Sequence, residues 1–151
     1  MKKILLSGIL LLLVIPGFAQ GYNEERTALT NFLTRMYNHA PFEGVRLVDD
    51  YDNTYLISVL ALDPTRYDTE SALNRVASVR AMSQASRFFN GSSITSDLII
   101  RTSEKSDGSS DTEIIEFISE RSAGYVRELE MLTTFKRENG EQVFIFFKKT
   151  D

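Results

Sequence analysis

Apolar positions along this chain follow a helical period in some stretches and a strand-like period in others, and the clearest helical stretch runs from Asp68 to Gly91. Asp68 or Thr69 can cap its first turn, and Asn90-Gly91 favours a left-handed exit. Apolar residues between these ends form two neighbouring stripes: Leu73, Val76, Val79 and Met82, and Ala77, Ala81, Ala85 and Phe88. The pattern predicts a long helix that packs through a broad apolar face.

The alanines of this helix predict what it packs against. Small residues spaced four apart let another backbone approach closely, and strand-like segments flank the helix on both sides. We therefore expect the helix to cover a sheet. Its solvent side is predicted to consist mainly of Asn74, Arg75, Arg80, Gln84 and Arg87.

Residues 23–62 predict a first helix followed by a hairpin. Residues 23–38 carry apolar side chains at helical spacing, and Pro41 ends any continuation. Residues 44–48 and 54–62 read as two antiparallel strands joined by a polar turn at 49–53. The second strand is apolar on both faces, so a helix can cover one face while the other awaits a further element, a partner or a second copy.

The remaining segments predict more strands. In residues 93–102, Ile94, Leu98 and Ile100 share one strand face, and residues 104–111 form a polar loop. Residues 112–121 fit a short helix, which we favour, or a strand. Strands at 125–136 and 142–149 are expected to form a final hairpin whose turn, at residues 137–141, contains Asn139-Gly140. The last strand again has two apolar faces, because Val143, Ile145 and Phe147 alternate with Phe144 and Phe146.

The first nineteen residues have the three parts of a secretory signal peptide: Lys2-Lys3, an apolar run at 4–15, and Pro16 to Ala19. We predict cleavage after Ala19, which leaves residues 20–151 as a single α+β domain. A retained anchor is the alternative, although the apolar run is short for a membrane span. The absence of cysteine excludes a lipidated lipoprotein and any disulfide. A periplasmic or secreted protein is expected, without a stable membrane anchor.

Charge argues against nucleic acid as a partner. The whole chain has a formal charge of −4, and removal of Lys2 and Lys3 leaves −6. Binding of nucleic acid needs a concentrated basic surface, which an acidic chain of this composition does not predict.

The order of elements and several motifs resemble a small bacterial envelope lipoprotein domain of the Lpp-twenty type, also found in flagellar assembly protein T. The resemblance covers Thr54 to Lys149 and rests on four segments: Ala72 to Phe89 with Arg80-Ala81, Ile94 to Thr102, Ser122 to Val126, and the strand pair that closes on Val143 to Ile145. It implies a small antiparallel sheet covered on one face by the Ala-rich helix, here with an additional N-terminal helix. It also implies an envelope-associated structural or interaction module without catalytic residues. The chain departs from the family in lacking the lipobox cysteine, which leaves membrane attachment open.

Candidate catalytic and metal-binding residues are few. His39 is the only histidine, and its place after a predicted helix suits a partner of the helix dipole. Asp49, Asp50 and Asp52 crowd one turn, and Asp107, Ser109, Asp111 and Glu113 alternate in a later loop. Neither group has the twelve-residue calcium-loop pattern, so we predict a turn and a solvated loop, with no metal or cofactor.

Glu128 and Glu130 are the one pair with a spacing that suits catalysis. On a strand they would point to the same face about 7 Å apart, as in glycosidases, but exposed positions of an antiparallel strand look the same.

We therefore expect a non-enzymatic envelope module that binds another envelope protein or itself. A periplasmic small-ligand binder, with a cleft between helix and sheet, is the alternative; a carboxylate-based hydrolase using Glu128 and Glu130 is the third hypothesis. The cleft would be lined by Tyr55, Tyr125, Phe135, Phe144 and Phe146.

Overall fold

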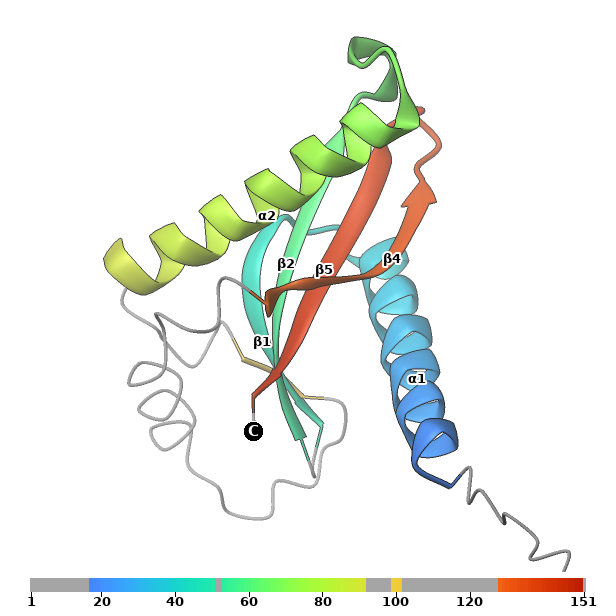
Figure 1. Ribbon diagram of the computed structural model, residues 1–151, viewed down its shortest axis with the longest axis vertical. Coiled ribbons are helices and arrows are strands. Elements are labelled where there is room, and N and C mark those ends of the chain that lie inside the picture. The colour runs from blue at the N-terminus through green and yellow to red at the C-terminus, as the bar shows by residue number, and fades with distance from the viewer. Residues whose placement is uncertain (1–16, 51–52, 92–98, 102–127, 151) are drawn as a thin grey trace, which may run out of the picture.

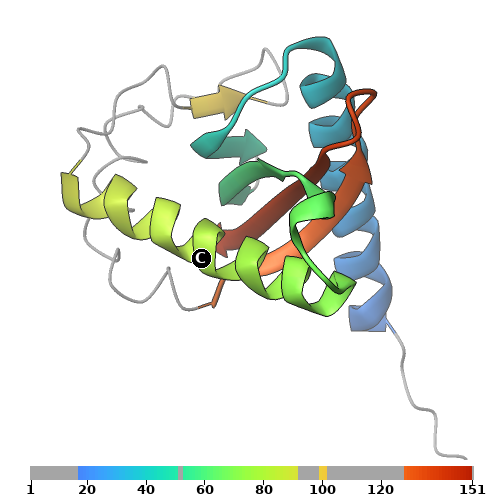
Figure 2. The ribbon, with the colours of Figure 1, turned by 90° about the horizontal axis from the view of Figure 1, so that it is seen from above.

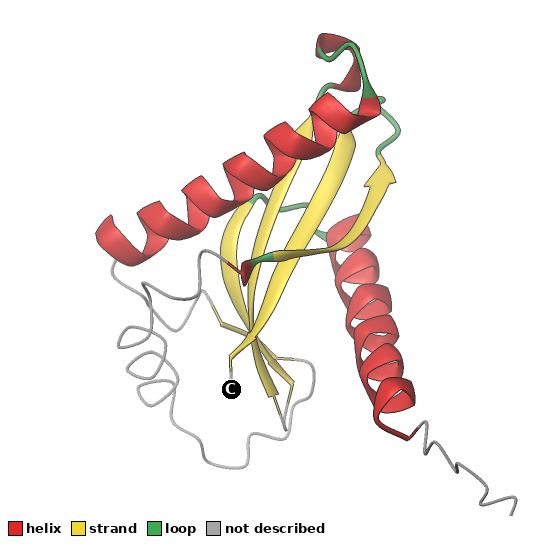
Figure 3. Cartoon of the chain, in the orientation of Figure 1, coloured by secondary structure: helices red, strands yellow, loops and turns green. Residues whose placement is uncertain are grey.

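The chain folds as an α+β domain in which two helices pack on a five-stranded sheet (Figures 1 and 3). The computed structural model describes residues 17–50, 53–91, 99–101 and 128–150. Its elements in chain order are α1 (Gly17–His39), β1 (Gly44–Asp50), β2 (Asn53–Leu62), the short 3-10 helix η1 (Pro64–Arg66), α2 (Glu70–Gly91), β3 (Ile99–Arg101), β4 (Glu130–Lys136) and β5 (Gln142–Thr150).

The sheet has the strand order β3-β1-β2-β5-β4. Neighbours β1 and β2, β2 and β5, and β5 and β4 pair antiparallel, which confirms the predicted antiparallel sheet. The short edge strand β3 differs, because it pairs with β1 in parallel. A parallel pair needs a long crossover, and the connection from β1 to β3 contains both β2 and α2.

Both predicted hairpins are confirmed. The β4–β5 turn is closed by Arg137 N, which donates to Glu141 O at 2.8 Å, and by Gly140 N, which donates to Arg137 O at 3.0 Å. Gly140 has a φ of 85°, the left-handed conformation that favours glycine. Of the predicted strand at 93–102, residues 99–101 form β3. The rest of that strand, the predicted segments at 104–111 and 112–121, and the part of the last hairpin before residue 128 lie outside the described residues.

Helix α2 lies close to the sheet through its alanines. Ala77, Ala81 and Ala85 are fully buried, and the hydroxyl of Ser58 on β2 lies 3.2 Å from the Ala81 carbonyl oxygen. Such a distance from a strand side chain to the helix backbone confirms the predicted close approach. The same hydroxyl is 2.8 Å from Gln84 Oε1, so Gln84, predicted on the solvent side, instead faces the sheet.

The predicted stripe of Leu73, Val76, Val79 and Met82 packs on the sheet only in part, since Leu73 and Val76 belong to the cluster under α2. Leu73 is buried, but Val79 is 56% exposed. The prediction of a broad face that includes Val79 was therefore wrong, because the helix packs with strand residues through Leu73, Val76, Ala77 and Ala81. Thr69 provides the N-cap, since its hydroxyl accepts from Ala72 N at 3.1 Å, and Asn90 and Gly91 are still helical.

The face of the sheet away from α2 is covered by α1, which answers the question that the two-faced strands raised. Leu29, Leu33 and Tyr37 pack with Val143, Ile145 and Phe147 and with β2 residues of the same face. Phe144 and Phe146 point the other way, into the cluster under α2. Figures 1 and 2 show α2 and α1 on different sides of the strands. No partner is needed to bury this part of the sheet.

Arg26 fixes α1 to the edge strand β4. Its guanidinium donates to the carbonyl oxygen of Met131, pairs with Glu130 at 3.3 Å, and lies 5.0 Å from the ring centroid of Phe147. One side chain thus joins residues more than a hundred positions apart in the sequence.

We expect Ala81→Leu to destabilise the domain by about 1–3 kcal/mol, because the larger side chain must separate α2 from the sheet. Chemical denaturation followed by circular dichroism measures the change. Ala28→Leu, at an exposed position of α1, is the matched control and should have little effect. Equal effects of the two substitutions would contradict the close packing of α2.

Arg26→Ala should lower the free energy of unfolding by about 1–2 kcal/mol, since it removes a charge-assisted hydrogen bond and a cation–π contact. Arg35→Ala provides the control, because Arg35 is exposed on the same helix. Denaturant titration of both variants tests the difference. A loss no larger for Arg26 than for Arg35 would show that the contact to β4 contributes nothing.

Tyr37→Phe should stabilise the domain. Tyr37 is 2% exposed, and its buried hydroxyl has no hydrogen-bond partner among the described residues, which costs about 1–3 kcal/mol. Burial raises the pKa of the phenol above 10.0, with Glu43 and Glu141 adding to this effect and Arg137 opposing it. Because the pKa of the phenol is higher in the folded state, its contribution to the free energy of unfolding is fully present below pH 10. That contribution is lost as the pH rises through the folded-state pKa.

Denaturation of the wild type and Tyr37→Phe at pH 7 and above pH 10 checks both parts of this prediction. The variant should be more stable at pH 7, and its advantage should grow in alkali. A less stable variant at pH 7 would show that the hydroxyl makes a favourable interaction.

Candidate functional site

The outward side of α2 combines an exposed apolar residue with positive charge. Val79 lies two positions from both Ala77 and Ala81, so it points about 200° around the helix from the buried line. Val79 is the only large hydrophobic residue that is mainly exposed in the described part of the chain. Arg75 lies one turn before Val79, Arg80 is the next residue, and Arg87 lies two turns further along; all three are exposed. We call these four residues the basic face of α2.

The charge of this face is not balanced on the helix itself. Glu70, in the first turn, is the one acidic residue of α2. Arg75 and Arg80 form no ion pair within the described residues, and Arg87 donates to the hydroxyl of Ser83 at 3.2 Å. The basic face therefore presents a local positive charge on a chain whose formal charge is −4.

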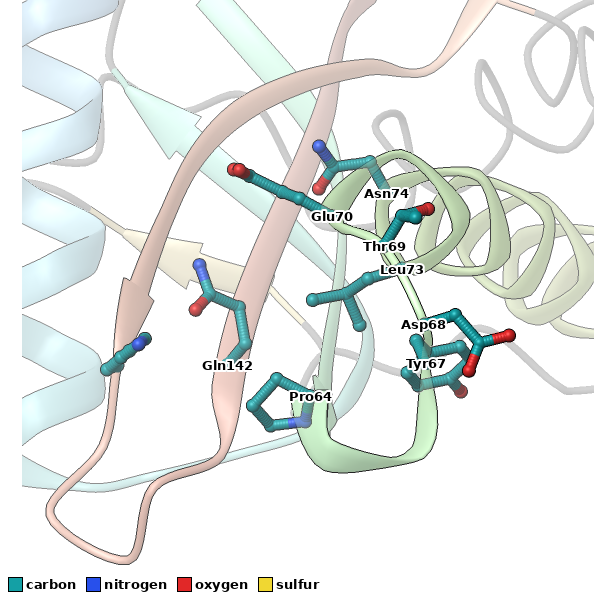
Figure 4. A pocket seen from close by; sticks show the side chains of 9 residues that line it. Pro64, Tyr67, Asp68, Thr69, Glu70, Leu73, Asn74 and Gln142 are labelled. Atoms are coloured by element: carbon teal, nitrogen blue, oxygen red, sulfur yellow. The ribbon is translucent and has the colours of Figure 1, made fainter.

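A pocket of about 370 Å³ lies where the start of α2 meets the end of the β4–β5 hairpin (Figure 4). Pro64, Tyr67 and Leu73 supply its apolar lining. The polar lining consists of Asp68, Thr69, Glu70, Asn74, Lys136 and Gln142. We call it the hairpin pocket.

Local hydrogen bonds hold the wall of the hairpin pocket that precedes α2. Asp63 caps η1, because its Oδ1 accepts from Thr65 N at 3.0 Å and from the Thr65 hydroxyl at 2.6 Å. These hydrogen bonds lower the pKa of the Asp63 carboxyl, with a smaller contribution from Arg66. Together with the Thr69 cap of α2, they fix the direction of the chain between β2 and the helix.

The two candidate catalytic carboxylates do not face one another. Glu130 is the first residue of β4 and pairs with Arg26 of α1, while Glu128 precedes the strand and pairs with Lys148. Arg26 lies over the ring of Phe147, and the side chains of Phe147 and its neighbour Lys148 point to opposite faces of β5. The two cations, Arg26 and Lys148, therefore lie on opposite faces of the sheet. The same-face prediction was wrong because the strand begins only at Glu130.

The aromatic residues proposed to line one cleft are divided between two cores. Tyr55 and Phe135 pack on the α1 side, while Phe144 and Phe146 pack on the α2 side. Tyr125 lies outside the described residues. These side chains fill the interior and do not line a common cleft.

The remaining candidates lie apart from both regions. His39 occupies the last turn of α1, where it is exposed, as predicted for a partner of the helix dipole. Asp49 and Asp50 belong to β1, whereas Asp52 and residues 107–113 are not among those described. Within the described ranges, no group of three acidic or histidine side chains is placed to hold a metal ion. Neither helix there is apolar enough over its length to span a membrane.

Sequence reasoning missed the exposure of Val79 and the hairpin pocket. The spacing of the alanines could have indicated the exposure of Val79, because a residue two positions from two buried alanines must point away from them. No local sequence pattern could have indicated the hairpin pocket, because its walls come from two distant segments, residues 64–74 and 136–142.

No protein-family model, curated protein or solved structure matches this chain. The resemblance to the envelope lipoprotein domain therefore stays a prediction.

Proposed function

We propose that this chain is an exported, non-enzymatic module of the bacterial cell envelope that binds another envelope protein through the basic face of α2. The observation that carries this proposal is the exposure of Val79 at the centre of an arginine-rich helix surface. The signal-peptide pattern of residues 1–19 and the family resemblance support export and an envelope role.

The composition of the basic face suits a protein partner. Arginine is enriched at interfaces, where its planar guanidinium binds carboxylates through two parallel hydrogen bonds. A central apolar contact at Val79, surrounded by charged residues, matches an apolar core with a polar rim. Fully exposed ion pairs contribute little, so we expect Val79 to provide the buried contact and the arginines to provide selectivity.

Self-association through this face is the weaker form of the proposal. Two copies of α2 facing one another would bring Arg75, Arg80 and Arg87 against like charges, and such contacts oppose binding. An acidic partner surface would complement them. We therefore favour a different protein with clustered carboxylates over a second copy.

Site-specific photo-crosslinking in intact cells tests the proposal. The full chain is expressed with its own leader, and a photoreactive phenylalanine replaces Val79 in one strain and Asn31, exposed on α1, in the control. We expect a processed protein that begins at Gln20 and a discrete adduct with one envelope protein from position 79 only. Replacing Arg75 and Arg80 with Glu should abolish the adduct, because the charge that attracts the partner is reversed.

Retention of the chain in the cytoplasm would overturn the export part of the proposal. Equal adducts from positions 79 and 31, or an adduct that survives the Arg75→Glu and Arg80→Glu replacements, would overturn the role of the basic face. An adduct with a second copy of the chain would show that this face binds another copy of the chain and would overturn the proposal of a different protein partner.

A further inference from the structure

The hairpin pocket has opposite charges on walls from different parts of the chain. Glu70 comes from the first turn of α2, and Lys136 from the last position of β4. Neither side chain forms an ion pair within the described residues, with the other or with a third group. Asp68 also lines the pocket, so its charged residues are two acids and one base. Glu70 and Lys136, which line it without meeting, produce a field across it. Such a field favours a ligand with both an anionic and a cationic group.

Gln142 adds an oriented polar group to this pocket. Its Nε2 donates to the Thr134 hydroxyl at 2.6 Å, and that hydroxyl donates to the Val143 carbonyl oxygen at 2.8 Å. Because the hydroxyl proton is used on Val143, Thr134 must accept from Gln142, and this assigns the two ends of the amide. Gln142 Oε1 is then an acceptor for an N–H donor. Figure 4 shows the Gln142 side chain across the pocket from Leu73.

The apolar lining sets the size and character of the rest of the ligand. Leu73 is 6% exposed and follows Glu70 by about one helical turn, and its side chain faces Gln142 in Figure 4. Pro64 and Tyr67 complete an apolar wall on the side where the chain enters α2. A volume of about 370 Å³ falls within the range of small-molecule sites. The lining is mainly polar, so most of the ligand's contacts would be polar and only part of it would pack on apolar side chains.

We propose that the hairpin pocket binds a small zwitterion, either a free amino acid or a short peptide with free ends. Lys136 binds the carboxylate, while Glu70 and Gln142 Oε1 bind the ammonium group. Asn74 can donate to or accept from either polar end. Leu73, Pro64 and Tyr67 pack against the apolar side chain. This site is distinct from the basic face of α2 and does not rest on the proposed protein interaction.

Titration of the chain beginning at Gln20, followed by backbone amide NMR, tests the proposal with three probes. L-leucine and L-leucyl-L-leucine carry both charges, whereas N-acetyl-leucinamide carries neither. We expect saturable shifts at residues 65–74, 136 and 142 from a charged probe and none from the blocked one. Saturation by leucine identifies an amino-acid site, and saturation by the dipeptide alone identifies a peptide site.

Charge variants distinguish recognition from packing. Glu70→Gln and Lys136→Met should each weaken binding about tenfold, the loss of one charge-assisted hydrogen bond. The controls Glu24→Gln and Lys149→Met lie outside the pocket and should bind as the wild type does. Exchange of the two charges, Glu70→Lys with Lys136→Glu, should restore part of the affinity.

Equal shifts from N-acetyl-leucinamide would overturn the proposal, because they would show apolar binding without charge recognition. Absence of shifts from both zwitterions at millimolar concentration would also overturn it. Spectra of each variant without ligand show whether it is folded, and both substituted side chains are exposed, so the fold should persist. Neither result affects the crosslinking test at Val79, which reports on a different surface.

Discussion

The paired strands β2 and β5 carry apolar side chains on both faces, and the rest of the fold follows from the need to cover both. Their register brings Ile57 beside Phe147 and Leu60 beside Phe144, so apolar residues from both strands alternate between two sides. Leaving either side in water would forfeit about 1.5–3 kcal/mol for each large side chain. A single helix can cover only one face, and the chain supplies α1 and α2 for the two.

The two helices cover the sheet in different ways, because their contact residues differ in size. Alanines bring α2 within hydrogen-bond distance of Ser58, and the residues on the opposite side of the helix from the alanines stay in solvent. The helix therefore turns Val79 and its arginines outward. On the other face, the larger side chains of Leu33 and Tyr37 pack with the aromatic rings of Phe135 and Phe147. Arg26 then anchors this helix at the sheet edge through polar contacts.

Periodicity and turn chemistry predicted both helices, the two hairpins and the apolar character of both sheet faces. They could not tell which element covers the second face, because an apolar face looks the same whether α1 or a partner buries it. The spacing of apolar residues also could not tell which side of α2 faces the sheet, because that depends on the small size of the alanines. For Glu128, the error came from assuming strand geometry before the strand begins. A register shift between Met131 and Thr133 further limits what alternation along β4 can predict.

The hairpin pocket depends on the same register as the core. Gln142 pairs with Leu62 at the end of β2 and with Lys136 at the end of β4, so three strand ends meet where the chain enters α2. A slip of one residue would turn Gln142 and Lys136 to the opposite face, and it would also turn Phe144 and Phe146 away from α2. The energy that holds the two-sided core in register therefore also holds the polar groups of the pocket in place. The polar groups of an open site can be well ordered in this way although they are not themselves fully buried.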